Sequence, residues 1–368
     1  MRLRDLKLTN YRNCKDLELD LSSKKILIIG KNAQGKTNIL ESIYFLSTLK
    51  SPRTSNNTEL INFEAEKAEI NCNMIKAETD VELDFTYSRE KKRELALNKV
   101  KTTPKNFKSV LKTVLFSTAD LLLLRGNPSD RRDWLDRAIS QVYPAYDDRL
   151  SKYDKIRIQK NNLLKDYLKT GNSNDTLLDV YNEQLVVTGS NIIFLRKKYL
   201  KEIERIAQEK HRIISETENL QISYDCSFLA DENELKDIAA AFHKSLEERR
   251  VEEMRRGQAC VGPHRDDVIF YINNNEATKF ASQGQQRTIV LALKLSELDI
   301  IAAKTGDEPV LLLDDVLAEL DDLRQNYLLK SINENTQTVI TSVDTILFED
   351  EFLKDVRIYK IENGELRN

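Results

Sequence analysis

The sequence predicts an α/β fold that is interrupted by a long helical insertion. Apolar strand-like segments alternate with helical segments near both ends of the chain, as in parallel α/β sheets. A glycine-rich loop joins one of these strands to a helix. The middle of the chain is charged and helical in its periodicity. We therefore expect residues 1–118 and 256–368 to form one α/β domain, with 119–255 as an inserted helical lobe.

The N-terminal part is expected to be rich in strands. LELDL (17–21) and VELDFTY (81–87) alternate apolar and polar residues, which is typical of half-buried antiparallel strands. KILIIG (25–30) is nearly all apolar and predicts a strand buried on both faces. In the C-terminal part, VIFYI (268–272), VLLLDD (310–315) and TVITS (338–342) are expected to be strands of a parallel α/β sheet.

The middle part is expected to form helices over 131–169 and 176–220, separated by a break at GNSND (171–175). Apolar positions of the second helix alternate spacings of four and three residues, as in a coiled coil, for only about four turns. These positions are Tyr181, Leu185, Thr188, Ile192, Leu195 and Tyr199. The pattern favours a helical lobe with a short coiled-coil-like arm over a long rod.

Composition limits the possible environments and partners. The 368 residues carry a net charge of only -3, so nucleic-acid binding would require a local basic patch. The four cysteines stand far apart, which fits free thiols in a reducing cytosol. The N-terminus lacks the apolar core of a signal peptide, and no stretch approaches a membrane span. We expect a cytoplasmic protein with no membrane attachment.

A phosphate-binding loop follows the strand KILII. The motif G-x-x-x-x-G-K-T needs close backbone approach at its glycines and amide groups that converge on phosphate oxygens. Its residues are Gly30, Lys31, Asn32, Ala33, Gln34, Gly35, Lys36 and Thr37. We expect Lys36 to reach the β- and γ-phosphates of ATP and Thr37 to bind Mg²⁺. The alternative is a glycine-rich turn that matches the motif by chance.

Two acids end the apolar run VLLLDD. Asp314 is predicted to be the carboxylate on the Mg²⁺ side, and Asp315 is placed to polarise an attacking water. Together with Lys36, they are the expected catalytic residues. Many related ATPases carry Glu at the second position, so the shorter Asp315 predicts slow hydrolysis. The alternative is that an Asp only caps the next helix.

The stretch SQGQQR (282–287) allows two interpretations. Ser282 and Gln285 have the spacing of a capping box, which is a purely structural role. The stretch also resembles the signature helix start of ABC-type ATPases. That resemblance implies that Ser282, Gly284 and Gln285 contact the ATP bound to a second copy, so that ATP produces a homodimer.

The chain as a whole resembles the RecF family of ABC-type ATPases. The interval between Lys36 and Asp314 is longer than in transporter ATPase subunits, and several segments match the family in order. These are LRDLKLTNYRN (3–13), GKNAQGKTNILESIYFL (30–46), SPRT (51–54), LFSTADLLLLRGNPSDRRDWLD (115–136), GPHRDD (262–267), SQGQQRT (282–288) and LLLDDVLAELD (311–321).

This resemblance implies an ABC-type ATPase head, a P-loop NTPase fold with a mixed sheet and helices. It also implies an ATP-dependent dimer that binds single- and double-stranded DNA at gaps. A weak, DNA-stimulated ATPase would act as a switch. The expected partners are RecR and RecO, with loading of RecA and a role in the SOS response. Alternatives are another SMC-like ATPase head, a nuclease-linked head, or the ATPase subunit of a transporter.

Two positions depart from the related pattern. Ala33 replaces a glycine seen in many relatives, which is expected to be harmless. No histidine follows the strand TVITS, so Thr341 or Ser342 is expected to contact the γ-phosphate instead.

Other charged segments are less specific. The best candidate for a DNA-binding patch is segment 85–112, which contains nine basic and two acidic residues. An equal alternative is that this segment is only the solvated surface of a hairpin. Its candidate DNA contacts are Arg89, Lys91, Lys92, Arg93, Lys99, Lys101 and Lys105. Arg131 and Arg132 are expected to form helix-surface ion pairs with Asp136. The charged segment GPHRDD (262–267) is expected to contact nucleotide or DNA, and the alternative is a plain turn into VIFYI.

Overall fold

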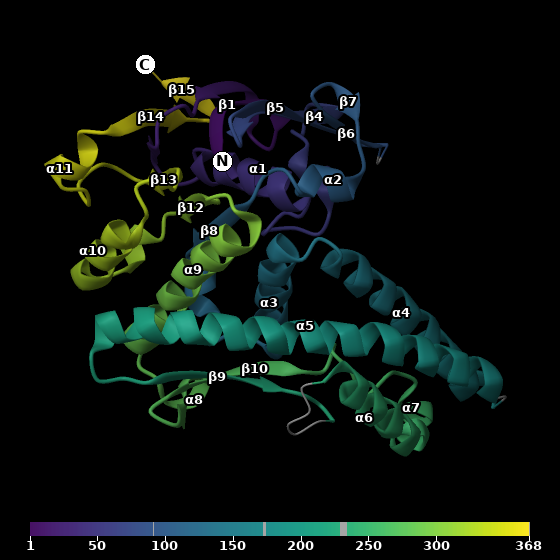
Figure 1. The fold of residues 1–368 in the computed structure, drawn as a ribbon. Coiled ribbons are helices and arrows are strands. Elements are labelled where there is room, and N and C mark those ends of the chain that lie inside the picture. The colour runs from purple at the N-terminus through teal and green to yellow at the C-terminus, as the bar shows by residue number, and fades with distance from the viewer. Residues whose placement is uncertain (91, 172–173, 229–233, 368) are drawn as a thin grey trace. The chain divides into compact units, whose positions relative to one another are not determined.

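The chain divides into two compact units in the computed structural model, which describes residues 1–90, 92–171, 174–228 and 234–367 (Figure 1). Unit 1 comprises Met1–Leu121 and Val290–Asn368, and unit 2 comprises Leu122–Ile289. The chain therefore re-enters unit 1 at Val290, later than the expected boundary at residue 256. Over the part of the chain that the structure describes, no helix has the length and apolarity of a membrane span.

A six-stranded sheet in unit 1 carries the glycine-rich loop. Its strand order is β15-β14-β3-β13-β12-β8, and all neighbours are parallel except β15. The strands are β3 (Lys25–Ile29), β8 (Thr113–Ser117), β12 (Val310–Asp314), β13 (Thr338–Ser342), β14 (Val356–Glu362) and β15 (Glu365–Arg367). The carboxyl ends of β3, β12 and β13 lie at one edge, so the loop after β3 and the acids after β12 come together.

A second, antiparallel sheet completes unit 1, with the order β2-β1-β4-β5-β6-β7. Its strands are β1 (Arg2–Tyr11), β2 (Cys14–Asp20), β4 (Lys67–Lys76), β5 (Thr79–Ser88), β6 (Arg93–Leu97) and β7 (Val100–Lys101). The strands expected at 17–21 and 81–87 are confirmed as β2 and β5. One hydrophobic core joins both sheets to α1 (Lys36–Thr48), where Phe45 packs edge-on against Phe85 at 4.7 Å.

Short helices complete unit 1 around these sheets. They are η1 (Asn57–Leu60), α2 (Pro104–Lys108), η2 (Asp120–Leu122), η3 (Leu317–Glu319), α10 (Asp322–Ser331) and α11 (Asp350–Leu353). The helix α9 (Gln283–Thr305) begins in unit 2 and continues into unit 1. η2 likewise ends on the first residue of unit 2.

Unit 2 is mainly helical, as the sequence predicted. Its helices are α3 (Pro128–Val142), α4 (Tyr146–Thr170), α5 (Asp175–Ser215), α6 (Leu235–Glu248), α7 (Arg250–Arg256) and α8 (Ala277–Phe280). α5 has 41 residues, and Figure 1 shows it as one long, unbroken helix. Leu185, Thr188, Ile192 and Tyr199 of its periodic stripe are buried. α4 and α5 flank the expected break, of which residues 172–173 lie outside the described residues.

The expectation that VIFYI (268–272) belongs to the parallel sheet is wrong. It forms β10 (Asp267–Ile272), which pairs antiparallel with β9 (Leu220–Asp225) and β11 (Asn275–Glu276) in unit 2. Val268, Phe270 and Ile272 are buried, whereas the residues between them are partly exposed. Those intervening residues, Ile269 and Tyr271, are themselves apolar or aromatic, so the period of two was hidden in the sequence.

Candidate functional site

The glycine-rich loop between β3 and α1 is fixed by contacts from distant parts of the chain. Gly35 has φ +108°, and a Cβ there would lie 2.7 Å from the Asn13 side-chain oxygen. The Gln34 carbonyl accepts a hydrogen bond from the Gly364 amide at 2.8 Å. The Asn363 amide donates to the Gln34 side chain at 2.7 Å. The loop therefore has a defined backbone shape, as binding of phosphate oxygens would require.

The N-terminus of α1 suits an anion. Within this fully described helix, no side chain caps the first turn and no acid lies in it, so its amide dipoles are not neutralised locally. The buried Lys36 ammonium donates to the carbonyls of Gly30 and Lys31 at 2.7 and 3.2 Å. Lys36 thus lies in the centre of the loop, where it would meet phosphate oxygens.

Ala33 does not fit its position without cost. Its φ is +64°, in the left-handed region, where a side chain crowds the backbone and costs about 1 kcal/mol. The expectation that alanine is harmless here is therefore wrong. Position in the middle of the motif did not reveal that this residue needs the conformation that glycine adopts freely.

Asp314 lies at the centre of a cluster of hard oxygen donors. Its Oδ1 accepts hydrogen bonds from the hydroxyls of Thr37 at 3.0 Å and Thr341 at 2.9 Å. Burial raises the pKa of Asp314, and the nearby Asp315 charge raises it further, while the two hydroxyls oppose the change. A hydroxyl and a carboxylate side by side are ligands that Mg²⁺ accepts, so the residues present fit that cation. A bound cation would also offset the cost of burying the charge.

Asp315 adopts a rare backbone conformation. Its φ is +50°, its amide donates to the Thr341 hydroxyl at 2.9 Å, and its carboxylate lies 3.9 Å from the Lys36 ammonium. Left-handed residues other than glycine are costly and collect at functional sites. The capping alternative is wrong, because the helical turn in VLAELDD is η3, whose N-cap is Val316 and has no side-chain capping bond. Asp321 instead caps the later helix α10, by accepting from the Arg324 amide at 3.0 Å.

Thr341, which was expected to contact the γ-phosphate, forms hydrogen bonds with both acids. Its hydroxyl donates to Asp314 and accepts from the Asp315 amide, and the side chain is buried. In the structure, Thr341 therefore holds the two acids in place. The sequence did not indicate this role, because the spacing along the chain does not show that β12 and β13 are neighbours.

A second charged cluster adjoins the loop. Glu41 of α1 is buried and accepts two hydrogen bonds from the Arg12 guanidinium, at 2.7 and 2.9 Å. Arg53 lies 3.8 Å from Glu41 and donates to Asn38 at 2.7 Å. All of these residues lie in segments that resemble the family, at 3–13, 30–46 and 51–54. The available signal for the cluster was Glu41 itself, the one charged residue in the mainly apolar segment 39–46 of α1, where a charge requires a buried partner.

The signature-like stretch of unit 2 forms the predicted capping box. The Gln285 amide donates to the Ser282 hydroxyl at 3.2 Å, and the Ser282 amide donates to the Gln285 side chain at 2.7 Å. Gln286 is buried and accepts from Arg125 at 3.0 Å, so it too has a structural role. Ser282 and Gln283 are exposed. Contact with a nucleotide stays a prediction for this stretch.

The basic patch of unit 1 is partly neutralised. Arg89 donates to three backbone carbonyls of residues 62–65, and Lys92 pairs with Glu90 at 2.5 Å. Lys99 and Lys101 lie 3.9 Å from acidic partners. Arg93 and Lys105 are exposed, and Lys91 lies outside the described residues. DNA binding by this patch remains a prediction.

The expected surface ion pairs of Arg131, Arg132 and Asp136 are wrong. Arg131 is buried and pairs with Asp267 at 2.6 Å. Asp136 accepts two hydrogen bonds from the buried Arg196, at 2.8 and 2.9 Å. These charges hold different segments of unit 2 together, which spacing along one helix could not show.

Comparison with known proteins gives consistent matches over the whole chain. A family model described as "RecF/RecN/SMC N terminal domain" matches residues 2–367. The DNA replication and repair protein RecF of Bacillus subtilis (strain 168) is 38% identical over 368 residues, covering 100% of both chains. The RecF protein of Bacillus cereus (strain G9842) is 38% identical over 366 residues, covering 99% of this chain and 98% of that protein.

Solved structures agree with this match. The recombination mediator protein RecF with ATP, described as part of the RecFOR pathway, superimposes with a TM-score of 0.91 at 33% identity, covering 100% of this chain and 97% of that one. An Smc head bound to the C-winged helix domain of ScpA has a TM-score of 0.56 at 14% identity, with coverage of 100% and 97%. This second likeness concerns the fold alone.

Proposed function

This chain belongs to the RecF family, and we propose that it is an ATP-dependent DNA-binding protein of recombinational DNA repair and replication. The observation that carries the proposal is the position of the Thr37 hydroxyl 3.0 Å from the Asp314 carboxylate, with the Lys36 ammonium 3.9 Å from Asp315. The RecF structure that superimposes with a TM-score of 0.91 is described as RecF-ATP, which supports ATP as the ligand here.

ATP binding would use the loop from Gly30 to Thr37. The amides of the loop and of the first turn of α1 would donate to phosphate oxygens, and the Lys36 ammonium would exchange its carbonyl contacts for theirs. Thr37 and Asp314 would hold Mg²⁺, which when bound would neutralise charge on the phosphates. Arg53, half-exposed and tied to Asn38 of α1, is near enough to the loop to assist.

Hydrolysis would be slow and would act as a switch. Asp315 would orient the attacking water and accept its proton, because its carboxylate lies 3.9 Å from Lys36 and its backbone is held by Thr341. Its short side chain reaches less far than that of Glu. The rate would therefore lie at or below the low end of ordinary enzymes, about 1 per second.

ATP would also join two copies of the chain. Ser282, Gly284 and Gln285 of one copy would contact the nucleotide of the other through the exposed helix start of α9. The dimer would bind single-stranded DNA and gapped or double-stranded DNA without sequence preference. We infer partners of the same pathway, RecR and RecO with RecA downstream, a role in the SOS response, and a cytoplasmic location.

Light scattering or sedimentation with and without ATP and Mg²⁺ tests this proposal. Wild type should become a dimer with ATP. Lys36→Ala should lose both ATP binding and dimerisation, whereas Ser282→Arg should bind ATP as a monomer. Ser151→Arg on the exposed surface of α4 is the matched control and should dimerise normally. A wild-type protein that stays monomeric at saturating ATP would contradict the dimer.

A further inference from the structure

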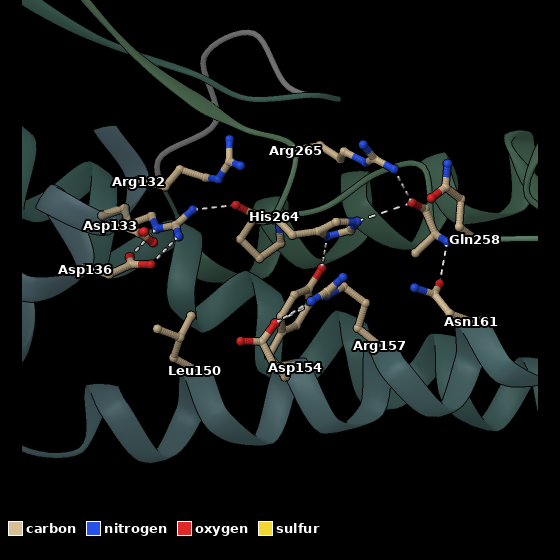
Figure 2. A pocket seen from close by; sticks show the side chains of 14 residues that line it. Arg132, Asp133, Asp136, Leu150, Asp154, Arg157, Asn161, Gln258, His264 and Arg265 are labelled. Carbon is tan, nitrogen blue, oxygen red and sulfur yellow. Dashed lines mark hydrogen bonds and ion pairs between the residues drawn. The ribbon is translucent and has the colours of Figure 1, made fainter. Parts of the chain in front are cut away.

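Unit 2 contains a cavity of about 430 Å³ beside the turn formed by residues 262–265, whose role the sequence left open (Figure 2). Side chains from α3, α4, α5 and the segment 258–265 line it. Four arginines are among them: Arg132, Arg157, Arg196 and Arg265. Because they come from four different segments, their convergence could not be seen in the sequence.

Two of these arginines are already neutralised. Arg196 is buried and forms a two-point contact with Asp136. Arg157 donates to the Asp154 carboxylate at 3.0 and 3.3 Å. Asp133 is the third acid that lines the cavity. Burial raises the pKa of Asp133, and the charges of Arg137 and Arg132 oppose this change.

Arg132 and Arg265 differ from the other two. Arg132 donates one hydrogen bond to the Asp266 carbonyl at 2.8 Å, and Arg265 donates one to the Ala259 carbonyl at 3.2 Å. Among the described residues, neither guanidinium has a carboxylate oxygen within 4.0 Å. Each therefore keeps N–H donors for a ligand, although Asp133 partly offsets the charge of Arg132.

His264 lies among the arginines of the cavity and is itself uncharged. Its Nδ1 accepts from the Tyr153 hydroxyl at 2.7 Å, and its Nε2 donates to the Ala259 carbonyl at 3.3 Å. Burial, with Arg157, Arg265 and Arg132 nearby, lowers the pKa of His264 to about 3, so the ring is neutral at physiological pH. Figure 2 shows these three arginines around the His264 ring.

The turn itself is rigidly built. Gly262 has φ +123°, and a Cβ there would lie 2.4 Å from the Tyr153 hydroxyl. The Pro263 carbonyl accepts from buried Arg196 at 2.6 Å. Arg265 is thus carried on a fixed backbone, as a pre-formed binding site requires.

We propose that this cavity binds a phosphate group of a nucleic-acid strand through the guanidinium groups of Arg132 and Arg265. Guanidinium forks match phosphate oxygens, and a cavity of this volume accommodates a group of nucleotide size. A nucleic-acid phosphate is favoured over a carboxylate ligand because this inference rests on the proposed DNA binding. The source is either an internal phosphodiester or a phosphorylated strand end.

Fluorescence anisotropy with labelled DNA over a salt series tests the site. Arg265→Gln and the Arg132→Gln/Arg265→Gln double variant are compared with Arg255→Gln, an exposed arginine that does not line the cavity. We expect about tenfold weaker binding for each pocket substitution, since each removes a charged donor. The slope of log affinity against log salt should fall by about one for each phosphate that a variant no longer binds.

Further arms separate the possible ligands. DNA with and without a 5′-phosphate distinguishes a strand end from an internal phosphate, and either result supports the proposal. Competition by a poly-glutamate peptide but not by inorganic phosphate would overturn it in favour of an acidic protein partner. Pocket variants that bind DNA as the Arg255→Gln control does would overturn the site and leave the proposed function standing. A wild-type protein that binds no DNA would instead refute the proposed function. ATP-induced dimerisation should persist in all variants and shows that they are folded.

Discussion

Removal of Asp136 should strongly destabilise unit 2. Arg196 has 2% of its side chain exposed, and Asp136 accepts from its Nε and Nη2 as well as from the Tyr146 hydroxyl at 2.5 Å. Asp136→Ala would leave the buried guanidinium with uncharged acceptors, namely the Pro263 carbonyl and the hydroxyls of Tyr224 and Tyr146. A buried charge that loses its partner costs about 3–5 kcal/mol, and we expect a loss of this size in the free energy of unfolding.

Urea unfolding followed by tryptophan fluorescence measures this loss. Trp134 is the chain's only tryptophan, it is buried, and it lies in α3 with Asp136, so its emission reports the unfolding of unit 2. Glu252→Ala, which breaks exposed pairs with Arg249 and Arg256, is the control and should change little. The double variant Asp136→Ala/Arg196→Met should recover part of the loss, because no unpaired charge remains. A loss below about 1 kcal/mol for Asp136→Ala would refute the reasoning.

Unit 1 offers three further tests. Asp314→Asn should stabilise the protein free of Mg²⁺ and nucleotide, because folding raises the pKa of this acid. The gain in the free energy of unfolding should be about 1.4 kcal/mol per unit by which folding raises this pKa. It should be complete above the pKa of the folded state and vanish as the pH falls to the ordinary value of 3.8, as thermal melting in EDTA over a pH series would show. Ala33→Gly should add about 0.5–1 kcal/mol by removing left-handed strain, whereas Ala303→Gly in α9 should cost about 1 kcal/mol, as urea unfolding would measure. If the basic patch of unit 1 binds DNA, Lys105→Gln should lower affinity and the salt slope equally for all sequences, whereas a loss confined to one sequence would exclude phosphate contact.

Local patterns in the sequence predicted the elements that depend on neighbouring residues. The glycine motif at 30–37 and the acids after VLLLD were found because strand, loop and helix follow one another directly. The capping box of Ser282 and Gln285 was found for the same reason. Each of these signals lies within one short segment of chain.

Contacts between distant segments could not be predicted in this way. The pairing of Thr341 with Asp314 depends on β13 lying beside β12, and the pairing of Arg196 with Asp136 joins α5 to α3. The strand at 268–272 was assigned to the wrong sheet because its pairing also depends on a distant partner, β9. Charge spacing along a helix was misleading for Asp136 because the residue faces the interior of unit 2 rather than water.

The order of strands around β3 has a consequence for how the chain is made. Both neighbours of β3 come from the last part of the sequence, β13 and β14, and the loop after β3 receives hydrogen bonds from Asn363 and Gly364. A ribosome therefore completes the glycine motif long before the residues that shape it emerge. We infer that the nascent chain cannot hold a nucleotide until translation has passed residue 364. The proposed assembly into a dimer would then be delayed until synthesis is nearly finished.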